Sequence, residues 1–279
     1  MRSFFQAFSR NKGGLIGLVV LLFVILLAAS ANLLFPQSPW NMVDGPFMPP
    51  FNGGPWLGTD TLGRDIAAGI AYGSRVSLLL GFVSTIVAVL LGTTLGALAG
   101  FLGGKTDQIV MGFTALFQTI PSFLFAVVLV AVLTPSIGTI AITVALVSWP
   151  PLTRLVRAEF MSLRTREFVQ AAVLSGQSSL RIMLTQILPN SLSPIIVSSS
   201  LMVASAILLE SGLSFLGLGD PNVMSWGFII GSSRSVIREG WWMSVFPGIA
   251  IMVTVLALNL IGEALNDALN PKLTQGRAG

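Results

Sequence analysis

The sequence contains no cysteine and no histidine. These absences exclude disulfide bonds, metal sites built from thiolates or imidazoles, and catalysis by either side chain. Charged residues are also few, at 9% of the 279 residues, against about 25% in soluble domains. Apolar residues make up 53% of the chain, and the mean hydropathy is +0.85. The composition therefore predicts one polytopic domain embedded in a membrane.

Six apolar segments approach or exceed the roughly 20 residues that a helix needs to cross a bilayer. They cover residues 15–35, 76–102, 108–132, 139–155, 191–209 and 243–262. We therefore predict an all-α polytopic membrane protein with six transmembrane helices. Pro121 lies in the middle of the third segment and predicts a local break, which either lines a pathway or is a packing kink.

The apolar cores of these segments lack ionisable residues, and Glu210 and Glu263 are placed at segment ends. Proton pumps and ion-coupled transporters usually carry such groups within the membrane. An intramembrane enzyme would need a nucleophile with a base, or a set of metal ligands. The absence argues against both classes and favours a driving force supplied by another protein.

The first apolar segment has two interpretations. Its core and the sequence Ala29-Ser30-Ala31 are similar to a signal peptide with its cleavage site. The apolar run continues through Leu33, Leu34 and Phe35, which favours an uncleaved anchor helix. Both interpretations place the preceding basic residues in the cytoplasm.

The distribution of basic residues predicts the orientation in the membrane. With six spans, eleven of the fifteen lysines and arginines fall on one side, and Arg64, Arg75, Arg234 and Arg238 fall on the other. Lysine and arginine concentrate on the cytoplasmic side of membrane proteins. Both termini and the loop at residues 159–190 are therefore predicted to be cytoplasmic. The basic residues flank apolar spans, so nucleic acid is not an expected partner.

Glycine recurs every four residues at Gly92, Gly96, Gly100 and Gly104. This spacing places bare backbone on one helix face, which suits close helix packing in lipid. The letters GFLGGKT at the end of this segment fall short of a nucleotide-binding P-loop, because Ala99 stands where that motif needs glycine.

The longest polar interruption covers residues 159–190. No glycine or proline occurs from Leu152 to Ser175, which predicts a continuous helix ended by Gly176. A second short helix is expected after Ser178, closed by Pro189. Its predicted apolar face is formed by Leu180, Met183, Leu184, Ile187 and Leu188. The pattern alone leaves open a plain helical loop between two spans.

The letters QAAVLSG and QILPN in this stretch resemble the "EAA" loop of ABC-importer permeases. The matching positions, together with the flanking acidic residue, are Glu167, Gln170, Ala171, Ala172, Gly176, Leu188 and Pro189. Gln170 stands where the family has glutamate, which puts a charged contact there in doubt. The resemblance implies a coupling helix that docks on an ATPase subunit.

Two further stretches resemble signatures of the dipeptide, oligopeptide and nickel branch of this family. The first, on the outer side, comprises Gly58, Thr59, Asp60, Gly63, Arg64 and Asp65. The second comprises Leu213, Ser214, Phe215, Leu216, Gly217, Leu218, Gly219, Trp226 and Gly227. From the residues alone, the first is also consistent with a surface loop held by Asp–Arg pairs. The second is consistent with a re-entrant turn with interfacial tryptophans, or with a gate beside a pathway.

The resemblance implies the type I ABC importer permease fold and a location in the bacterial inner membrane. It implies residues 1–75 as an anchor helix with a periplasmic loop, 76–270 as the permease core and 271–279 as a cytoplasmic tail. The implied partners are a second permease, two ATPase subunits, a periplasmic binding protein and membrane lipid. The chain itself is then not an enzyme and binds no cofactor, since ATP and Mg²⁺ belong to the ATPases. The implied substrates are short peptides, with nickel chelates or glutathione-like compounds as alternatives. A self-sufficient channel or secondary transporter is the more distant alternative.

Overall fold

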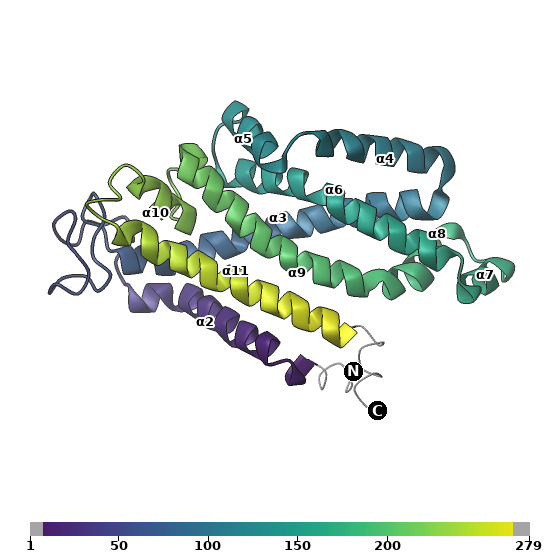
Figure 1. Ribbon diagram of the computed structural model, residues 1–279, viewed down its shortest axis with the longest axis horizontal. Helices are drawn as coiled ribbons and strands as arrows, with labels where there is room; N and C mark the ends of the chain where they lie inside the picture. The colour runs from purple at the N-terminus through teal and green to yellow at the C-terminus, as the bar shows by residue number, and fades with distance from the viewer. Residues whose placement is uncertain (1–7, 270–279) are drawn as a thin grey trace.

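The computed structural model describes residues 8–269, and within them it contains helices and no β-strand. Figure 1 shows the helices as one elongated bundle. The elements are α2 (Lys12–Leu34), α3 (Ile66–Leu102), α4 (Gly104–Thr119), α5 (Ser122–Val132), α6 (Ile137–Arg164), α7 (Glu167–Leu174), α8 (Ser179–Ile182), α9 (Leu188–Leu213), α10 (Trp226–Ser233) and α11 (Trp242–Leu269). Two π-helical turns, Met183–Ile187 and Ser214–Leu218, flank α9. The tail predicted at 271–279 lies outside the described residues.

Within residues 8–269, five helical spans are long and apolar enough to cross a membrane. Helices α4 and α5 form a sixth when they are counted as one broken span, bent by 83°. The prediction of six spans is confirmed on that count. The third span is two helices rather than one, because Pro121 is the N-cap of α5 and has no N–H to continue α4.

Three predicted boundaries are wrong. The second span begins at Ile66 rather than residue 76, because the side chain of Asp65 accepts a hydrogen bond from Ala67 N and caps the helix. The helix expected from Leu152 to Ser175 stops at Arg164, and α7 is a separate helix. Pro189 does not close a helix: it lies in the first turn of α9, within a continuous span that includes α8. The π turn before it already interrupts the regular hydrogen bonds, so the proline is accommodated.

The predicted apolar face of residues 180–188 is also partly wrong. Met183 and Ile187 are buried, together with Ile182, but Leu180 is 65% exposed and Leu184 is 53% exposed. The π turn over Met183–Ile187 adds a residue to the turn and rotates the later side chains away from the expected stripe.

The glycine face of α3 packs directly on α6. A Cβ atom at Gly92, Gly96 or Gly100 would lie 3.0, 2.6 or 2.6 Å from a backbone carbonyl oxygen of α6. The predicted close helix packing is therefore confirmed for these three positions. Gly104 does not belong to this face, because it starts α4 with a φ of +53° and a Cβ there would meet no atom within 4 Å.

We expect Gly96→Ala to destabilise the permease, because the added methyl would overlap Thr153 O and Val156 Cβ. Overpacking of this kind costs about 1–3 kcal/mol. Thermal unfolding of the purified protein in detergent measures the effect. Gly112→Ala is the matched control, since a Cβ at that exposed site in α4 meets no atom within 4 Å. Equal melting temperatures for the two variants would contradict the close approach of α3 and α6.

The first and last described helices meet at one end of the bundle. Asn11 Nδ2 donates a hydrogen bond to Asp267 Oδ2 at 3.0 Å, which joins the start of α2 to the end of α11. Figure 1 shows α7 and α8 toward this end, at the right, and α10 with the segment between α2 and α3 at the left. The predicted cytoplasmic elements therefore share one end of the molecule.

Candidate coupling site and outer signatures

Helix α7 projects from the end of α6 after a sharp break. Arg166 adopts extended backbone angles between the two helices, and its N–H donates to Leu163 O at 3.0 Å. The side-chain amide of Gln170 donates to Thr165 O at 3.2 Å and ties α7 back to the break. A glutamate carboxylate could not make this bond, because it has no proton to donate. Glu167 lies in the first turn, where the helix dipole favours negative charge.

The end of α7 is a tight turn centred on Gly176. Gly176 N donates to Val173 O at 3.0 Å, and Gln177 N donates to Ala172 O at 3.2 Å. These two bonds form a Schellman motif, which needs a left-handed residue just after the helix. Gly176 has a φ of +74° and is this left-handed residue. The prediction that Gly176 ends this helix is confirmed.

The two faces of α7 have different surroundings. Val169 and Ala172 are buried and belong to the same apolar cluster as Val156 and Phe160 of α6. The opposite face presents Phe168, Ala171 and Leu174, and Leu174 is 89% exposed. We call these three residues the α7 patch. Spacings of three residues place them on one side of the helix.

The predicted coupling residues are thus divided between the two faces and the turns. Ala171, Glu167 and Gln170 are exposed, whereas Ala172 is 6% exposed. Leu188 packs against the cluster that holds Ala172, and Pro189 is exposed at the start of α9. The sequence analysis missed Phe168 and Leu174. The pattern that could have identified them is a set of apolar residues on the side of α7 opposite Val169 and Ala172.

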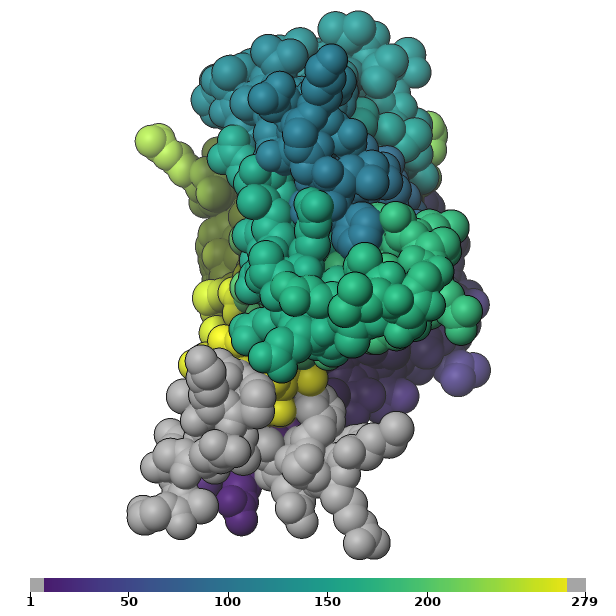
Figure 2. Space-filling model, turned by 90° about the vertical axis from the view of Figure 1, so that its right-hand side faces the viewer, coloured from purple at the N-terminus to yellow at the C-terminus, as the bar shows by residue number. Residues whose placement is uncertain are grey.

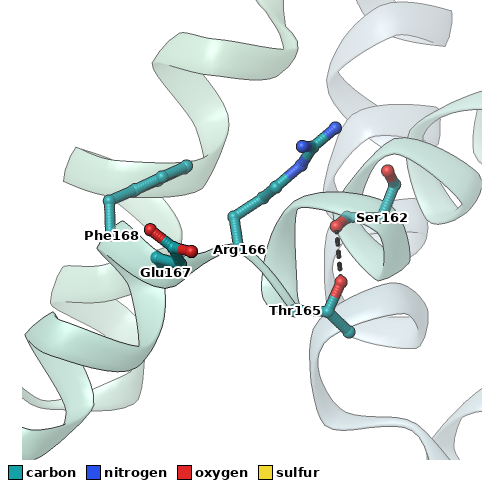
Figure 3. A pocket seen from close by; sticks show the side chains of 5 residues that line it. All are labelled: Ser162, Thr165, Arg166, Glu167 and Phe168. Atoms are coloured by element: carbon teal, nitrogen blue, oxygen red, sulfur yellow. Dashed lines mark hydrogen bonds between the residues drawn. The ribbon is translucent and has the colours of Figure 1, made fainter.

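A hollow of about 750 Å³ opens at the break between α6 and α7. Ser162, Thr165, Arg166, Glu167 and Phe168 line it, and Thr165 Oγ1 donates to Ser162 O at 3.0 Å. Figure 3 shows Arg166 extending between Ser162 of α6 and Thr165 just after it, on one side, and the side chains of Glu167 and Phe168 on the other. Figure 2 shows the green helices at residues 165–190 projecting from this end face. The end of the bundle therefore carries an apolar patch beside a polar hollow.

The first outer signature folds around one buried ion pair. Arg64 Nε donates to Asp60 Oδ2 at 2.5 Å, and both side chains are about nine-tenths buried. The guanidinium also lies 5.2 Å from the ring centre of Trp40 and 5.8 Å from that of Phe228 in α10. The pair therefore joins the loop to α10. An Asp–Arg pair holds the loop, as the alternative interpretation expected, but the pair is buried rather than at the surface.

The two remaining charged side chains of this segment, Asp65 and Arg75, bond to the backbone of helices. Burial raises the pKa of the Asp65 carboxyl, although hydrogen bonds from Ala67 N and Ala68 N oppose this shift. Arg75 Nε donates to Ala28 O at 2.5 Å and Arg75 Nη2 to Ala29 O at 3.1 Å, at the last turns of α2. Asp65 thus caps the start of α3, whereas Arg75 ties α3 to carbonyl groups along α2.

Glycine and threonine of the signature close the loop on itself. Gly58 and Gly63 have φ values of +79° and +75°, and a Cβ atom on either would lie within 2.4 Å of a carbonyl oxygen. Thr59 Oγ1 donates to Gly45 O at 2.7 Å, and Thr59 O accepts from Trp242 Nε1 at 3.0 Å. These residues build the outer loop and attach it to α11.

The second outer signature encloses a buried carboxyl group. Glu210 is 2% exposed and accepts hydrogen bonds from Ser214 Oγ at 2.8 Å and Ser225 Oγ at 2.7 Å. Ser225 also caps α10 by accepting from Phe228 N. Glu210 therefore fastens α10 to the end of α9. Glu210 lies in the last turn of α9, near the end of the span Ser179–Leu218, as its predicted place at a segment end implies.

The backbone of this signature is packed closely. Gly217 has a φ of +85°, and a Cβ at Gly219 would lie 2.5 Å from Ser214 Oγ. A Cβ at Gly227 would lie 2.8 Å from Ser211 Cα. Leu213 is buried and Leu218 half-buried, whereas Phe215 and Leu216 are exposed.

Two of the tryptophans expected at the membrane interface are core residues. Trp226 is 1% exposed and donates from Nε1 to Ile70 O at 2.9 Å, and Trp242 is also buried. Trp241 is half exposed. The interfacial prediction is therefore wrong for Trp226 and Trp242, because each is buried with a carbonyl partner, Ile70 O in α3 for the first and Thr59 O in the loop before α3 for the second.

The fold and these sites define a multi-pass, all-helical membrane protein with an exposed helix, α7, at one end. A family model described as the binding-protein-dependent transport system inner membrane component matches residues 92–275, and the chain belongs to this family. A second model, the N-terminal TM domain of oligopeptide transport permease C, matches residues 1–50. The protein is therefore an inner-membrane permease component.

The chain is similar to named permeases over nearly its whole length. It is 39% identical to the di/tripeptide transport system permease protein of Pseudomonas aeruginosa, covering 98% of this chain and 92% of that protein. It is 41% identical to the dipeptide transport system permease protein of Alkalihalophilus pseudofirmus, covering 98% and 90%. It is 37% identical to the oligopeptide transport system permease protein of Haemophilus influenzae, covering 96% and 87%.

A solved structure supports the fold. An inward-facing conformation of the MetNI methionine ABC transporter aligns with a TM-score of 0.60 at 15% identity, covering 72% of this chain and 96% of that one. The predicted ABC-importer permease fold is therefore confirmed.

Proposed function

We propose that this chain is the membrane-spanning permease subunit of an ATP-driven importer of short peptides. It pairs with a second permease and two ATPase subunits, and a periplasmic binding protein delivers the substrate. ATP and Mg²⁺ bind to the ATPases, and this chain binds no cofactor. Relatives named as dipeptide and oligopeptide permeases, at 37–41% identity, support the choice of peptides over nickel chelates or glutathione-like compounds.

The α7 patch is the observation that carries this proposal. Exposed apolar side chains on a helix that projects beyond the bundle indicate a protein interface. The excess of basic residues at this end supports a cytoplasmic position. An ATPase in the cytoplasm could therefore dock on Phe168, Ala171 and Leu174.

Motion of α7 has a direct route into the bundle. Val169 and Ala172 pack on Val156 and Phe160 of α6, and Ile187 at the start of α9 belongs to the same cluster. Arg157 of α6 also holds Asp107 of α4 in a bidentate ion pair, with Nη2 and Oδ2 2.6 Å apart. A displacement of α7 driven by ATP would thus reach three spans and alternate access to a central pathway.

Single cysteines test this docking, because the chain has none of its own. Leu174→Cys should cross-link to the co-expressed ATPase subunit, with a yield that changes when ATP is added. Ala172→Cys is the matched control, since its side chain faces the core and should not react. Thr134→Cys, exposed after α5, serves as the control for the opposite end. No cross-link at Leu174→Cys in an assembled complex would refute the coupling role.

A further inference from the structure

A second hollow, of about 630 Å³, lies at the break between α4 and α5. It is enclosed by the start of α5, the middle of α6 and the second half of α9. Hydroxyl groups from all three helices line it, from Ser122, Ser148, Ser198 and Ser205. Its other lining side chains are apolar and include Met202, and no charged residue lines it. The hollow is thus a neutral surface with several hydrogen-bonding groups.

Most of these hydroxyls are available for a ligand. Ser205 Oγ donates to Leu201 O at 3.1 Å within its own helix. The described residues offer no hydrogen-bond partner to the side chains of Ser122, Ser148 and Ser198. A hydroxyl both donates and accepts, so each can pair with an amide N–H or an amide C=O.

The backbone around the hollow adds free donors and acceptors. Pro150 and Pro151 have no N–H, so the carbonyls of Leu146 and Val147 lose their usual helical partners. Helix α5 starts at Ser122 with no side-chain cap, which leaves its first N–H groups unpaired. At membrane depth, such backbone is tolerated where it is buried in protein or lines a water-filled cavity. Ser122, Val147 and Pro151, which belong to this irregular backbone, line the hollow beside the 83° bend between α4 and α5.

We infer that this hollow is the surface on which the chain contacts the backbone of a peptide in transit. The inference rests on the proposed function and extends it to named residues. A peptide backbone presents amide donors and acceptors in every sequence, and the hollow supplies neutral partners for both. A lipid chain would leave the hydroxyls unsatisfied, which is unfavourable in hydrocarbon. Met202 adds a flexible apolar wall that can adapt to different peptide side chains.

The first test measures access and protection in the assembled importer, with cysteine introduced at Ser198. A small, water-soluble thiol reagent should label Ser198→Cys, and a transported dipeptide present during ATP hydrolysis should slow the labelling. Ser199→Cys is the matched control, because the neighbouring Ser199 donates to Ile195 O and does not line the hollow. Labelling of Ser199→Cys should be insensitive to the dipeptide. Labelling of Ser198→Cys that the dipeptide leaves unchanged would overturn the inference.

The second test measures uptake of a labelled dipeptide into membrane vesicles. Removing both hydroxyls in Ser148→Ala/Ser198→Ala should lower uptake about three- to tenfold, as expected for one or two lost hydrogen bonds. Ser199→Ala should leave uptake unchanged. Unchanged uptake in the double variant would overturn the inference while the peptide importer stands. Failure of the unaltered complex to take up any peptide would instead refute the proposed function, and the inference with it.

Discussion

Replacing Leu174 with aspartate should abolish ATP-driven uptake while the permease still folds and inserts. Leu174 is 89% exposed, so the substitution removes little contact within the chain. In the proposed complex this side chain, the most exposed of the α7 patch, would be covered by the ATPase, and a carboxylate there would be buried without a partner. If Leu174 is a hot spot of this interface, its loss costs about 2 kcal/mol or more, which weakens binding about 30-fold or more. Uptake into vesicles and ATPase activity stimulated by the binding protein measure the loss of coupling.

The control for this substitution is Ser178→Asp. Ser178 is exposed at the same end, lies outside the α7 patch, and is the N-cap of α8, where aspartate is equally suitable. It introduces the same charge, so it separates a local electrostatic effect from loss of the patch. Normal uptake with Leu174→Asp would remove α7 from the coupling interface.

Removing the carboxylate of Asp60 should destabilise the outer half of the permease strongly. The Asp60→Ala variant leaves the guanidinium of Arg64 buried without its charged partner. Breaking a buried ion pair in this way costs about 3–5 kcal/mol. Asp60 Oδ1 also accepts from the N–H groups of Leu62 and Arg64, so the turn loses its internal bonds as well. A large fall in melting temperature in detergent is the expected result.

Asp44→Ala provides the comparison within the same loop. Asp44 is exposed, and its Oδ1 accepts a hydrogen bond from the adjacent Gly45 N. The Asp44→Ala variant should change the melting temperature little, because the removed carboxylate is exposed and leaves no buried charge without a partner. If Asp60→Ala and Asp44→Ala melted alike, the Asp60–Arg64 pair would not be a structural centre of the loop.

The amino-acid sequence by itself determined the class of protein and much of its architecture. The scarcity of charge and the apolar runs predicted a helical membrane protein with six spans, because hydrocarbon admits long apolar helices with internally satisfied backbones. The four-residue glycine spacing predicted a close helix contact, and the structure shows that the partner is α6. Gly176 predicted the end of α7 because the required backbone angle is one that glycine tolerates.

The tertiary structure decided which residues are buried and which are exposed. Ala172 faces the core and Leu174 faces outward, because the break at Arg166 sets the direction of α7. The π turn before Pro189 removed the expected helix end and rotated the apolar stripe. Neither the break at Arg166 nor the π turn can be predicted from the local periodicity of the sequence.

The polar centres depended on partners far away in the chain. Trp226 donates to Ile70 O across 156 positions, and Trp242 to Thr59 O across 183. Glu210 gains Ser225 from the next helix, which makes its burial possible within a span. A buried polar group is stable where hydrogen-bond partners meet it, and those partners are brought together by the packing of helices rather than by neighbouring residues.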